Sequence, residues 1–351
     1  MRSISAHVIF LMVLFTGGVF AAVLLGMPAS SLTSFSPEDD LRTRAHVCTE
    51  KPTAPPENTR PIQVLTGLQA TYSITCELCK GTEIRVVSVF PERVPMFAQT
   101  RYLGENTPVI KRIASQSAAA ITIRSVWSKD PLFAALRAQN IRLVEIDACC
   151  PVEPERRSVA LIDVSRKTSE NTDAKSIPYV WLSLANATRM AEIISEDLIR
   201  IAPDESAKIN ENLARLKRAL FSIRSTYNAK FAELQVLEAV TLCPDFIYLT
   251  GEFQIDVLDY EPKPEIYWSD VDCQELTRLL RDRKIGVVIH KWRPAKNILD
   301  AIHAAGAHLV VLNPMDSSMA DDTEPANVSY VAVMEENMRL LHDAFVTNNG
   351  N

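Results

Sequence analysis

The chain has 351 residues, of which 47% are hydrophobic and 23% are charged. These proportions are typical of globular proteins and exclude disorder throughout the chain. The net charge of −6 argues against a general nucleic-acid binder, which would carry a basic face. Glycine occurs only 10 times, and the patterns G-x-G, G-x-x-x-x-G-K, G-x-S-x-G and H-E-x-x-H do not occur. Dinucleotide-binding, P-loop, serine-hydrolase and zincin functions therefore lack sequence support.

The N-terminal segment is typical of an exported protein. The 20 residues from Val8 to Met27 carry no charge, and a helix of this length spans about 30 Å, the thickness of a bilayer core. Arg2 precedes this run, so the rest of the chain is expected outside the membrane. We interpret residues 1–29 as a signal peptide or a retained membrane anchor, with both open. Residues 30–60 are rich in Ser, Thr, Pro and Glu and are expected to form a flexible tether.

Seven cysteines are present, and an exported chain can hold disulfides. Cys76 and Cys79 form a C-x-x-C pair, which is a weak signal for a redox site or a zinc ribbon because no second such pair follows. We therefore expect one or two structural disulfides among the six cysteines other than Cys243.

Short apolar runs alternate with helical patterns along the rest of the chain. Such runs are typical of parallel strands covered on both faces, and the alternation predicts an α/β fold. Four strands, a break and four more strands indicate two similar lobes with mostly parallel sheets. The predicted strands are Ile62–Thr66, Ile84–Phe90, Ala119–Arg124, Ile141–Ile146, Ala239–Leu242, Asp256–Asp259, Val287–His290 and His308–Leu312.

The break between the two sets of strands predicts one long helix. Apolar residues recur at steps of three and four from Ile209 to Leu234, which places them on one helix face. The helix is expected to run over Glu205–Glu238, about 51 Å at the standard rise. We favour a single helix that lies across the backs of both lobes. A coiled coil is the alternative, because most of the steps also fit heptads.

Four stretches resemble the metal-binding extracytoplasmic solute-binding proteins of zinc and manganese ABC importers. Ile177–Leu182 looks like the family's D-P-H-x-W-L, and Asn186–Asp204 looks like the helix that follows, with its L-D-P-E-N end. Val240–Leu249 looks like V-T-S-H-D-A-F-x-Y-L, and Asn327–Asn337 looks like the closing G-x-S-Y-x-x-M-M-x-x-N helix. The order and spacing of these stretches make the resemblance fairly specific.

The resemblance implies two α/β lobes joined by one long rigid helix, with a metal held in the cleft between the lobes. It extends over residues 61–346 and divides them into three parts. These parts are an N-terminal lobe over 61–204, a linking helix over 205–238 and a C-terminal lobe over 239–346.

The resemblance also implies where the ligands lie, and this sequence departs from the family at each position. The family usually takes two histidines from the first lobe, then a histidine or glutamate and an aspartate from the second. Met96, Tyr179, Cys243 and Asn313 stand at these positions, and Asp245 lies two residues beyond Cys243. These five residues are the candidate metal ligands.

Other residues and other roles stay open at this stage. By analogy, Asp316 or His290 could add donors at a strand end, whereas the segment His290–Pro294 as a whole is expected to be a solvated loop. Four of the five candidate ligands also have a structural alternative. These alternatives are a core gap-filler for Met96, an aromatic contact for Tyr179, a buried apolar side chain or disulfide half for Cys243, and a turn residue for Asn313.

The donor types do not name one metal. Met and Cys favour a soft ion such as Cu(I), a tyrosine phenolate suits Fe(III), and Asp245 would supply a carboxylate. A transition metal, another small ligand in the same cleft, and no ligand at all therefore remain three separate hypotheses.

The resemblance, together with the export segment, implies an extracytoplasmic solute-binding protein of a metal-type ABC uptake transporter, in the periplasm or at the cell surface. Its expected partners are an ABC permease in the membrane and a metal ion or small ligand as cargo, with no nucleic acid. The alternative is a degenerate scaffold or interaction module of the same fold that binds no metal. An enzyme is not expected, because the sequence shows no nucleophile–base pair and no cofactor motif.

Overall fold

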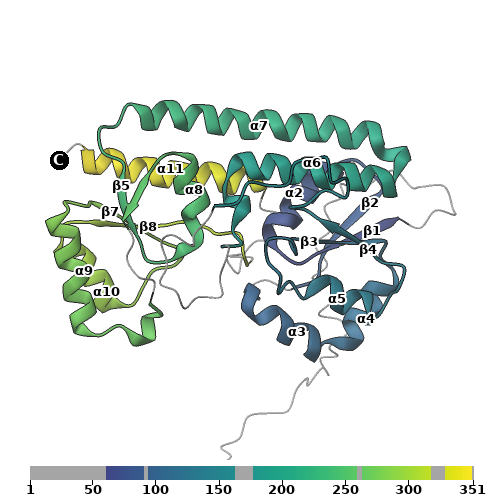
Figure 1. Cartoon of the computed structure of the whole chain (residues 1–351), viewed down its shortest axis with the longest axis horizontal. Coiled ribbons are helices and arrows are strands. Elements are labelled where there is room, and N and C mark those ends of the chain that lie inside the picture. Colours follow the sequence, from purple (N-terminus) through teal and green to yellow (C-terminus); the bar gives the residue numbers. More distant parts are fainter. Residues whose placement is uncertain (1–60, 91–93, 163–176, 259–262, 318–328, 350–351) are drawn as a thin grey trace, which may run out of the picture. The chain divides into compact units, whose positions relative to one another are not determined.

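Two parallel four-stranded sheets organise the computed structural model, which describes residues 61–90, 94–162, 177–258, 263–317 and 329–349 (Figure 1). The first sheet has the order β2-β1-β3-β4, and its strands are β1 (Ile62–Thr66), β2 (Ile84–Ser88), β3 (Ala119–Thr122) and β4 (Val144–Asp147). The second has the order β6-β5-β7-β8, and its strands are β5 (Glu238–Thr241), β6 (Asp256–Leu258), β7 (Val287–His290) and β8 (His308–Val311). The two sheets thus have the same topology.

Helices fill the connections between the strands. The α-helices are α2 (Gln69–Cys79), α3 (Gln99–Glu105), α4 (Thr107–Ser115), α5 (Leu132–Arg137), α6 (Leu184–Ile201), α7 (Ser206–Ala232), α8 (Ile247–Glu252), α9 (Asp270–Asp282), α10 (Lys296–Ala304) and α11 (Tyr330–Asn349). The short 3-10 helices are η1 (Met96–Ala98), η2 (Val180–Leu182), η3 (Pro203–Glu205), η4 (Pro244–Phe246) and η5 (Glu265–Tyr267). Among the described residues, no helix is both long enough and apolar enough to cross a membrane. The predicted signal peptide or anchor and the predicted tether lie outside the described residues.

Alternate residues of each strand face different hydrophobic clusters, as the pleat of a strand requires. In β1, Val64 belongs to a large cluster that also includes residues of α2, α6, α7 and α11. Its neighbour Leu65 belongs to a smaller cluster with residues of α3, α4 and α5. In the second sheet, Val287 faces the large cluster, whereas Val288 faces α9 and α10. Both sheets are therefore covered on two faces, which is why their strands are nearly continuous apolar runs.

The predicted fold class is confirmed, since all eight predicted strands form and every strand pairing is parallel. The range predicted for the fourth strand, Ile141–Ile146, is wrong at its start, because the strand begins only at Val144. Asn140 forms a turn there: its main-chain oxygen accepts from Leu143 N, and its side-chain oxygen accepts from Arg142 N. Ile141 is consequently 79% exposed.

Helix α7 is the predicted long helix and is 27 residues long. Its buried residues recur at steps of three and four and face α2, α6 and α11 of the same chain, which favours the single helix over a coiled coil. Asn212 Nδ2 donates to the main-chain oxygens of Leu78 and Lys80, both at 2.8 Å, and so fixes α7 to the end of α2.

The prediction that the long helix continues to Glu238 is wrong. Helix α7 ends at Ala232, because the backbone beyond it is used by the second sheet. The carbonyl of Leu237 accepts from Asp256 N at 2.7 Å, and Glu238 already pairs with Asp256 in the sheet.

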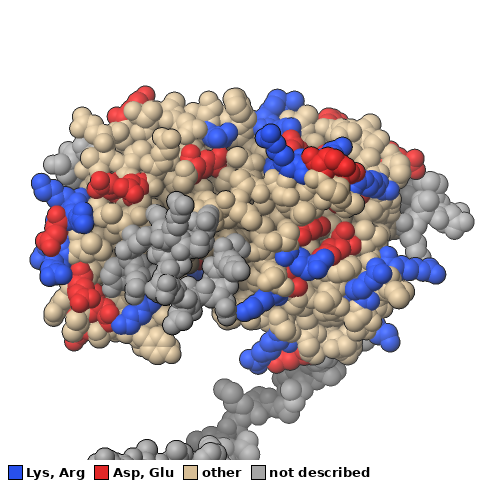
Figure 2. Space-filling model, in the orientation of Figure 1, with Lys and Arg blue, Asp and Glu red and all other residues tan. Residues whose placement is uncertain are grey.

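Helices α6 and α7 are also joined at their surface by an ion pair. Glu192 on α6 accepts from Arg189 at 3.0 Å and from Lys217 on α7 at 2.5 Å. Figure 2 shows basic and acidic side chains mixed over this face of the protein. Exposed pairs of this kind contribute at most about 1 kcal/mol each, so the buried contacts described next matter more to the packing.

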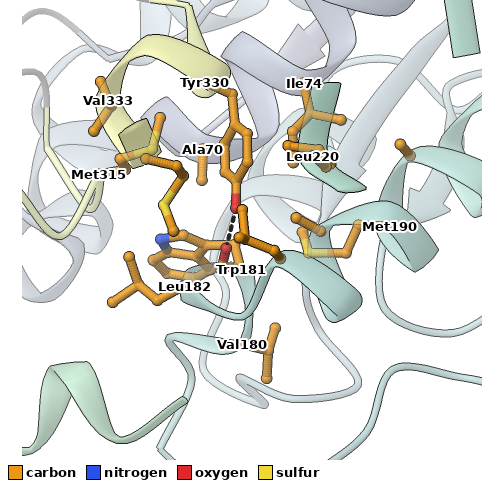
Figure 3. Packing of buried hydrophobic residues seen from close by; sticks show 14 of the residues in the cluster. Ala70, Ile74, Val180, Trp181, Leu182, Met190, Leu220, Met315, Tyr330 and Val333 are labelled. Atoms are coloured by element: carbon orange, nitrogen blue, oxygen red, sulfur yellow. Dashed lines mark hydrogen bonds between the residues drawn. The ribbon is translucent and has the colours of Figure 1, made fainter. Parts of the chain in front are cut away.

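Trp181 joins the two halves of the fold. It is fully buried, and its indole Nε1 donates at 2.8 Å to the main-chain oxygen of Pro314, which follows β8. The hydroxyl of Tyr330, at the start of α11, donates to the main-chain oxygen of Trp181 (Figure 3). Ala70 N at the start of α2 donates to Met315 O at 3.2 Å. The loop after β8 is thereby held directly from η2 and α2, and Trp181 of η2 is held in turn from α11.

The cysteines confirm one structural disulfide, since Cys76 is disulfide-bonded. The second member of the C-x-x-C pair, Cys79, is a free thiol. Burial, followed by the charge of Glu205, raises the pKa of this thiol to about 12. A thiol that stays protonated is a poor nucleophile, so the C-x-x-C pair does not have the properties of a redox site.

We expect Tyr330→Phe to lower the free energy of unfolding by about 1–3 kcal/mol, because it leaves the buried carbonyl of Trp181 without its donor. Urea denaturation measures this difference. Tyr267→Phe is the matched control, since Tyr267 is 64% exposed and its change should stay within about 0.5 kcal/mol. Equal stability of the two variants would show that the Tyr330 hydrogen bond does not hold α11 in place.

Candidate functional site

Three charged side chains gather at the carboxyl edge of the second sheet. Asp245 lies in η4, four residues after β5, Lys291 follows β7 directly, and Asp316 lies five residues after β8. Parallel strands end at the same edge, and ligands of open α/β sheets bind there. Tyr179, which directly precedes η2, reaches the same group of side chains from the other half of the fold.

Lys291 is the centre of this group. Its Nζ lies 2.5 Å from Asp245 Oδ2 and 3.4 Å from Asp316 Oδ2, and it donates to the Tyr179 hydroxyl at 3.3 Å. The Tyr179 hydroxyl in turn donates to Asp316 Oδ2 at 2.8 Å. Both carboxylates are buried, with exposed fractions of 4% for Asp245 and 7% for Asp316. The four side chains, named here the Lys291 cluster, therefore form one connected network.

Burial and charge act in opposite directions within the Lys291 cluster. Burial raises the pKa of Asp245, while Lys291 counteracts part of that rise. Burial disfavours the charge of Lys291, but Asp245 and Asp316 outweigh it, so the lysine pKa is raised. Burial, then Asp245 and Asp316, hold the pKa of Tyr179 well above its usual range. The cluster thus combines a protonated phenol and an ammonium with the carboxyl groups of Asp245 and Asp316.

Aromatic rings flank the ammonium. Lys291 Nζ lies 5.5 Å from the ring centre of Tyr179 and 5.2 Å from that of Trp292, distances at which a cation is attracted to an aromatic face. Tyr179 itself packs on the ring of Trp181, with 5.2 Å between ring centres. The surroundings of Lys291 therefore form a cage of two carboxyl groups, the phenol of Tyr179 and the indole of Trp292, which suits a cation.

The loop that presents Asp316 is fixed and locally strained. Met315 adopts φ 55°, a left-handed conformation that a non-glycine residue rarely adopts. Its N–H donates to Asn313 Oδ1 at 2.9 Å, and the contacts to Trp181 and Ala70 hold the same loop. Strain of about 1–3 kcal/mol is typical of such conformations and tends to occur at functional sites. In this loop, it directs the next residue, Asp316, toward Lys291.

Two predicted ligands, Tyr179 and Asp245, come together in the Lys291 cluster. Cys243 lies next to it: its thiol is buried, and burial followed by the charge of Asp245 raises its pKa to about 12. Met96, in η1, packs in the large hydrophobic cluster. The side-chain oxygen of Asn313 accepts a hydrogen bond from Met315 N, so Asn313 acts as a turn residue, which is its structural alternative.

Lys291 is the residue that sequence reasoning missed. The expectation that His290–Pro294 is a solvated loop is wrong at three positions, because His290 and Pro294 are buried and Lys291 is partly buried. His290 is 2% exposed, and the side chain of Lys291 is 18% exposed. The position of Lys291 directly after a buried strand is the sequence feature that indicates a place in the site. Asp316, in contrast, was anticipated as a possible further donor.

A small pocket of about 220 Å³ adjoins the cluster. Lys291 lines it, together with His290, Glu265, Trp268 and Trp292. Burial lowers the pKa of His290, whose Nε2 lies 3.5 Å from Glu265 Oε1. Neither ring nitrogen, Nδ1 or Nε2, has a hydrogen-bond partner among the described residues. The pocket therefore combines a neutral imidazole, a carboxylate and two indole rings.

The described residues include no group of three or more His, Cys, Asp and Glu side chains arranged to hold a metal ion. The oxygen donors that do converge are Asp245, Asp316 and Tyr179, with Lys291 between them. Fold and site thus define a two-sheet α/β protein with a cation-holding cage at the carboxyl edge of its second sheet.

Residues 135–344 match the ZnuA family, described as zinc-uptake complex component A, periplasmic. This match extends over more than half of the chain, so the protein belongs to the ZnuA family. The resemblance inferred from the sequence motifs is thereby confirmed.

Curated relatives agree with this assignment. The zinc-binding lipoprotein AdcA of Streptococcus pneumoniae (strain ATCC BAA-255 / R6) is 27% identical over 168 residues, which are 47% of this chain and 33% of AdcA. The chain thus spans about a third of the length of this relative. A putative metal-binding protein of Treponema pallidum (strain Nichols) is 22% identical over 299 residues, 82% of this chain and 88% of the relative.

Solved structures share the fold. The Zn(II)-bound ZnuA-like domain of Streptococcus pneumoniae AdcA matches with a TM-score of 0.64 and 18% identity, over 81% of this chain and 99% of that domain. An FpvC mutant from Pseudomonas aeruginosa matches with a TM-score of 0.65 and 16% identity, over 82% of this chain and all of that chain. At these identities the likeness shows the architecture alone.

We expect His290 to make the protein more sensitive to acid. Its pKa is lowered in the folded state, so below the unfolded pKa of about 6.5 the unfolded chain takes up a proton that the fold resists. This contribution to stability is present above that pH and is lost as the pH falls through the folded pKa. Between pH 7 and pH 5, unfolding free energy should therefore fall more steeply for the wild type than for His290→Gln, by up to about 1.4 kcal/mol per pH unit.

Urea titrations at several pH values measure this slope, with His308→Gln at an exposed position as the control. Identical slopes for the wild type and His290→Gln would contradict the assignment of a buried neutral imidazole.

Proposed function

We propose that the protein is the extracytoplasmic solute-binding component of a metal-type ABC importer, a binding protein and not an enzyme. Membership of the ZnuA family supports this proposal, as does the uncharged segment near the N-terminus, which is typical of export. Among its relatives, AdcA is named a zinc-binding lipoprotein, and FpvC has been solved in complex with Mn²⁺. An ABC permease in the membrane is the proposed partner, and the periplasm or cell surface is the proposed location.

The observation that carries the proposal is the convergence of buried oxygen donors on one cation position. Asp245, Asp316 and Tyr179 all reach the point that Lys291 Nζ occupies. Two buried carboxylates are stable only beside positive charge, so a site of this composition requires a cation. We propose these three residues as the cargo donors.

The donor set also indicates which metals fit. Carboxylate and hydroxyl oxygens suit hard cations such as Mn²⁺, and zinc also accepts carboxylates. A soft ion such as copper fits less well, because Cys243 is a protonated thiol and Met96 packs in the hydrophobic cluster. Of the five residues first proposed as ligands, we therefore keep Tyr179 and Asp245 and add Asp316, whereas Met96, Cys243 and Asn313 receive structural roles.

One observation favours a second candidate, a scaffold that binds no metal. The ammonium of Lys291 already neutralises part of the charge of Asp245 and Asp316, so the cluster is stable without cargo. A scaffold of this kind would keep the fold and its contacts with a partner. Metal binding to the wild-type protein separates the two candidates.

Calorimetric titration with Mn²⁺ and Zn²⁺ tests the proposal. We expect Asp245→Asn and Asp316→Asn each to weaken binding by at least about tenfold, since each removes a proposed direct donor and the loss of even an outer-shell partner of a ligand typically costs 10–100-fold in metal affinity. Asp300→Asn is the matched control, because Asp300 is an exposed carboxylate that pairs with Lys296 on the surface.

Binding that both Asn variants leave unchanged would place the metal elsewhere and contradict the proposed site. A wild-type protein that binds neither ion would instead support the scaffold.

A further inference from the structure

Lys291 stands where a cargo ion would stand. Its Nζ contacts an oxygen of Asp245, an oxygen of Asp316 and the hydroxyl of Tyr179. A divalent ion bound to the same oxygens would lie within a few ångströms of the ammonium, and like charges at such a distance in a buried site repel strongly. The ammonium and a metal ion therefore cannot share this position.

The structure also contains a place for the displaced lysine. The pocket of about 220 Å³ has Lys291 in its wall and Glu265 on its lining. Glu265 accepts hydrogen bonds from Trp292 Nε1 and Ala295 N, but the imidazole beside it, His290, has a lowered pKa and is neutral at physiological pH. Lys263, which also lines this pocket, pairs with Asp272 at 2.7 Å, so the carboxylate of Glu265 can take up the ammonium.

We propose that Lys291 is a tethered cation that determines the selectivity of the site. The lysine occupies the cation position when cargo is absent, and cargo binds by displacing its ammonium toward Glu265. This inference rests on the proposed function, since it describes how the same site admits its cargo. No bond is made or broken in the exchange.

The exchange lowers the apparent affinity of the site for every cargo ion. Every cargo ion must replace an ammonium that the chain itself holds in place, so the apparent affinity is lower than the intrinsic affinity of the oxygens. A monovalent cation has the same charge as the ammonium, so the two carboxylates attract it no more strongly and it does not displace Lys291. A divalent ion has twice the charge and can overcome the competition.

The variant Lys291→Met tests this role, because methionine is also unbranched but carries no charge. We expect Mn²⁺ to bind Lys291→Met at least about tenfold more tightly than it binds the wild type. Lys296→Met is the control, since Lys296 is exposed and pairs only with Asp300 among the described residues. It should bind Mn²⁺ with the affinity of the wild type.

The outcomes separate this inference from the proposed function. If the wild type binds Mn²⁺ and Lys291→Met binds it no more tightly, the tethered cation is refuted while the proposed function stands. If only Lys291→Met binds Mn²⁺, the lysine does occupy the site, and the wild type is the metal-free scaffold. If neither protein binds Mn²⁺ or Zn²⁺ and both are folded, both the proposed function and the inference fail.

Lys291→Met leaves two buried carboxylates without their cation, so a measurement on the wild type is needed in case the variant does not fold. Reductive methylation followed by mass spectrometry reports the accessibility of each lysine amine. We expect modification of Lys291 to be slow without metal and several-fold faster with saturating Mn²⁺, while that of Lys296 stays constant. Modification of Lys291 that Mn²⁺ leaves unchanged or slows would overturn the proposed displacement.

Glu265 provides a test of where the lysine goes. In the wild-type background, Glu265→Gln should weaken Mn²⁺ binding several-fold, because the displaced ammonium loses its new partner. In the Lys291→Met background, the same substitution should have little effect, since no ammonium is displaced. Equal effects in both backgrounds would show that Glu265 acts on the metal site independently of Lys291.

Discussion

The contact between Lys291 and two buried carboxylates is the interaction on which the site depends. Removing a charge from water costs free energy. Deleting one partner of a buried ion pair typically lowers the stability of the fold by about 3–5 kcal/mol. Asp245 and Asp316 are therefore stable at these buried positions only beside a cation, which the chain itself supplies. This constraint makes the site stable when empty and gives every incoming ion a competitor.

The fold brings the partners of this interaction together from distant parts of the sequence. Asp245, Lys291 and Asp316 lie after three parallel strands, so they meet at one edge of the sheet. Tyr179 comes from the other half of the fold, where Trp181 and Tyr330 hold its segment against the loop after β8. The hydrophobic cluster shared by α2, α6, α7 and α11 thus fixes the donors as well as the two sheets.

Much of the fold could be predicted from the sequence, and less of the site. All eight strands were found because both faces of each sheet are covered, which makes the strands apolar runs. The end of α7 was missed, because the pairing of Glu238 with Asp256 is not visible in a helical pattern. A family motif indicates Tyr179, and Asp245 was added because it lies two residues beyond the motif position of Cys243. Lys291 looked like a surface residue because its partners are 46, 25 and 112 positions away along the chain.

Crystal structures grown with and without Mn²⁺ test this account most directly, because the anomalous signal of manganese locates the ion beside its donors. The account predicts Lys291 Nζ between Asp245 and Asp316 without metal. With Mn²⁺, it predicts an anomalous peak bonded to both carboxylates and the lysine turned toward Glu265. An anomalous peak away from these carboxylates, or a peak between them with Lys291 unmoved, would contradict it.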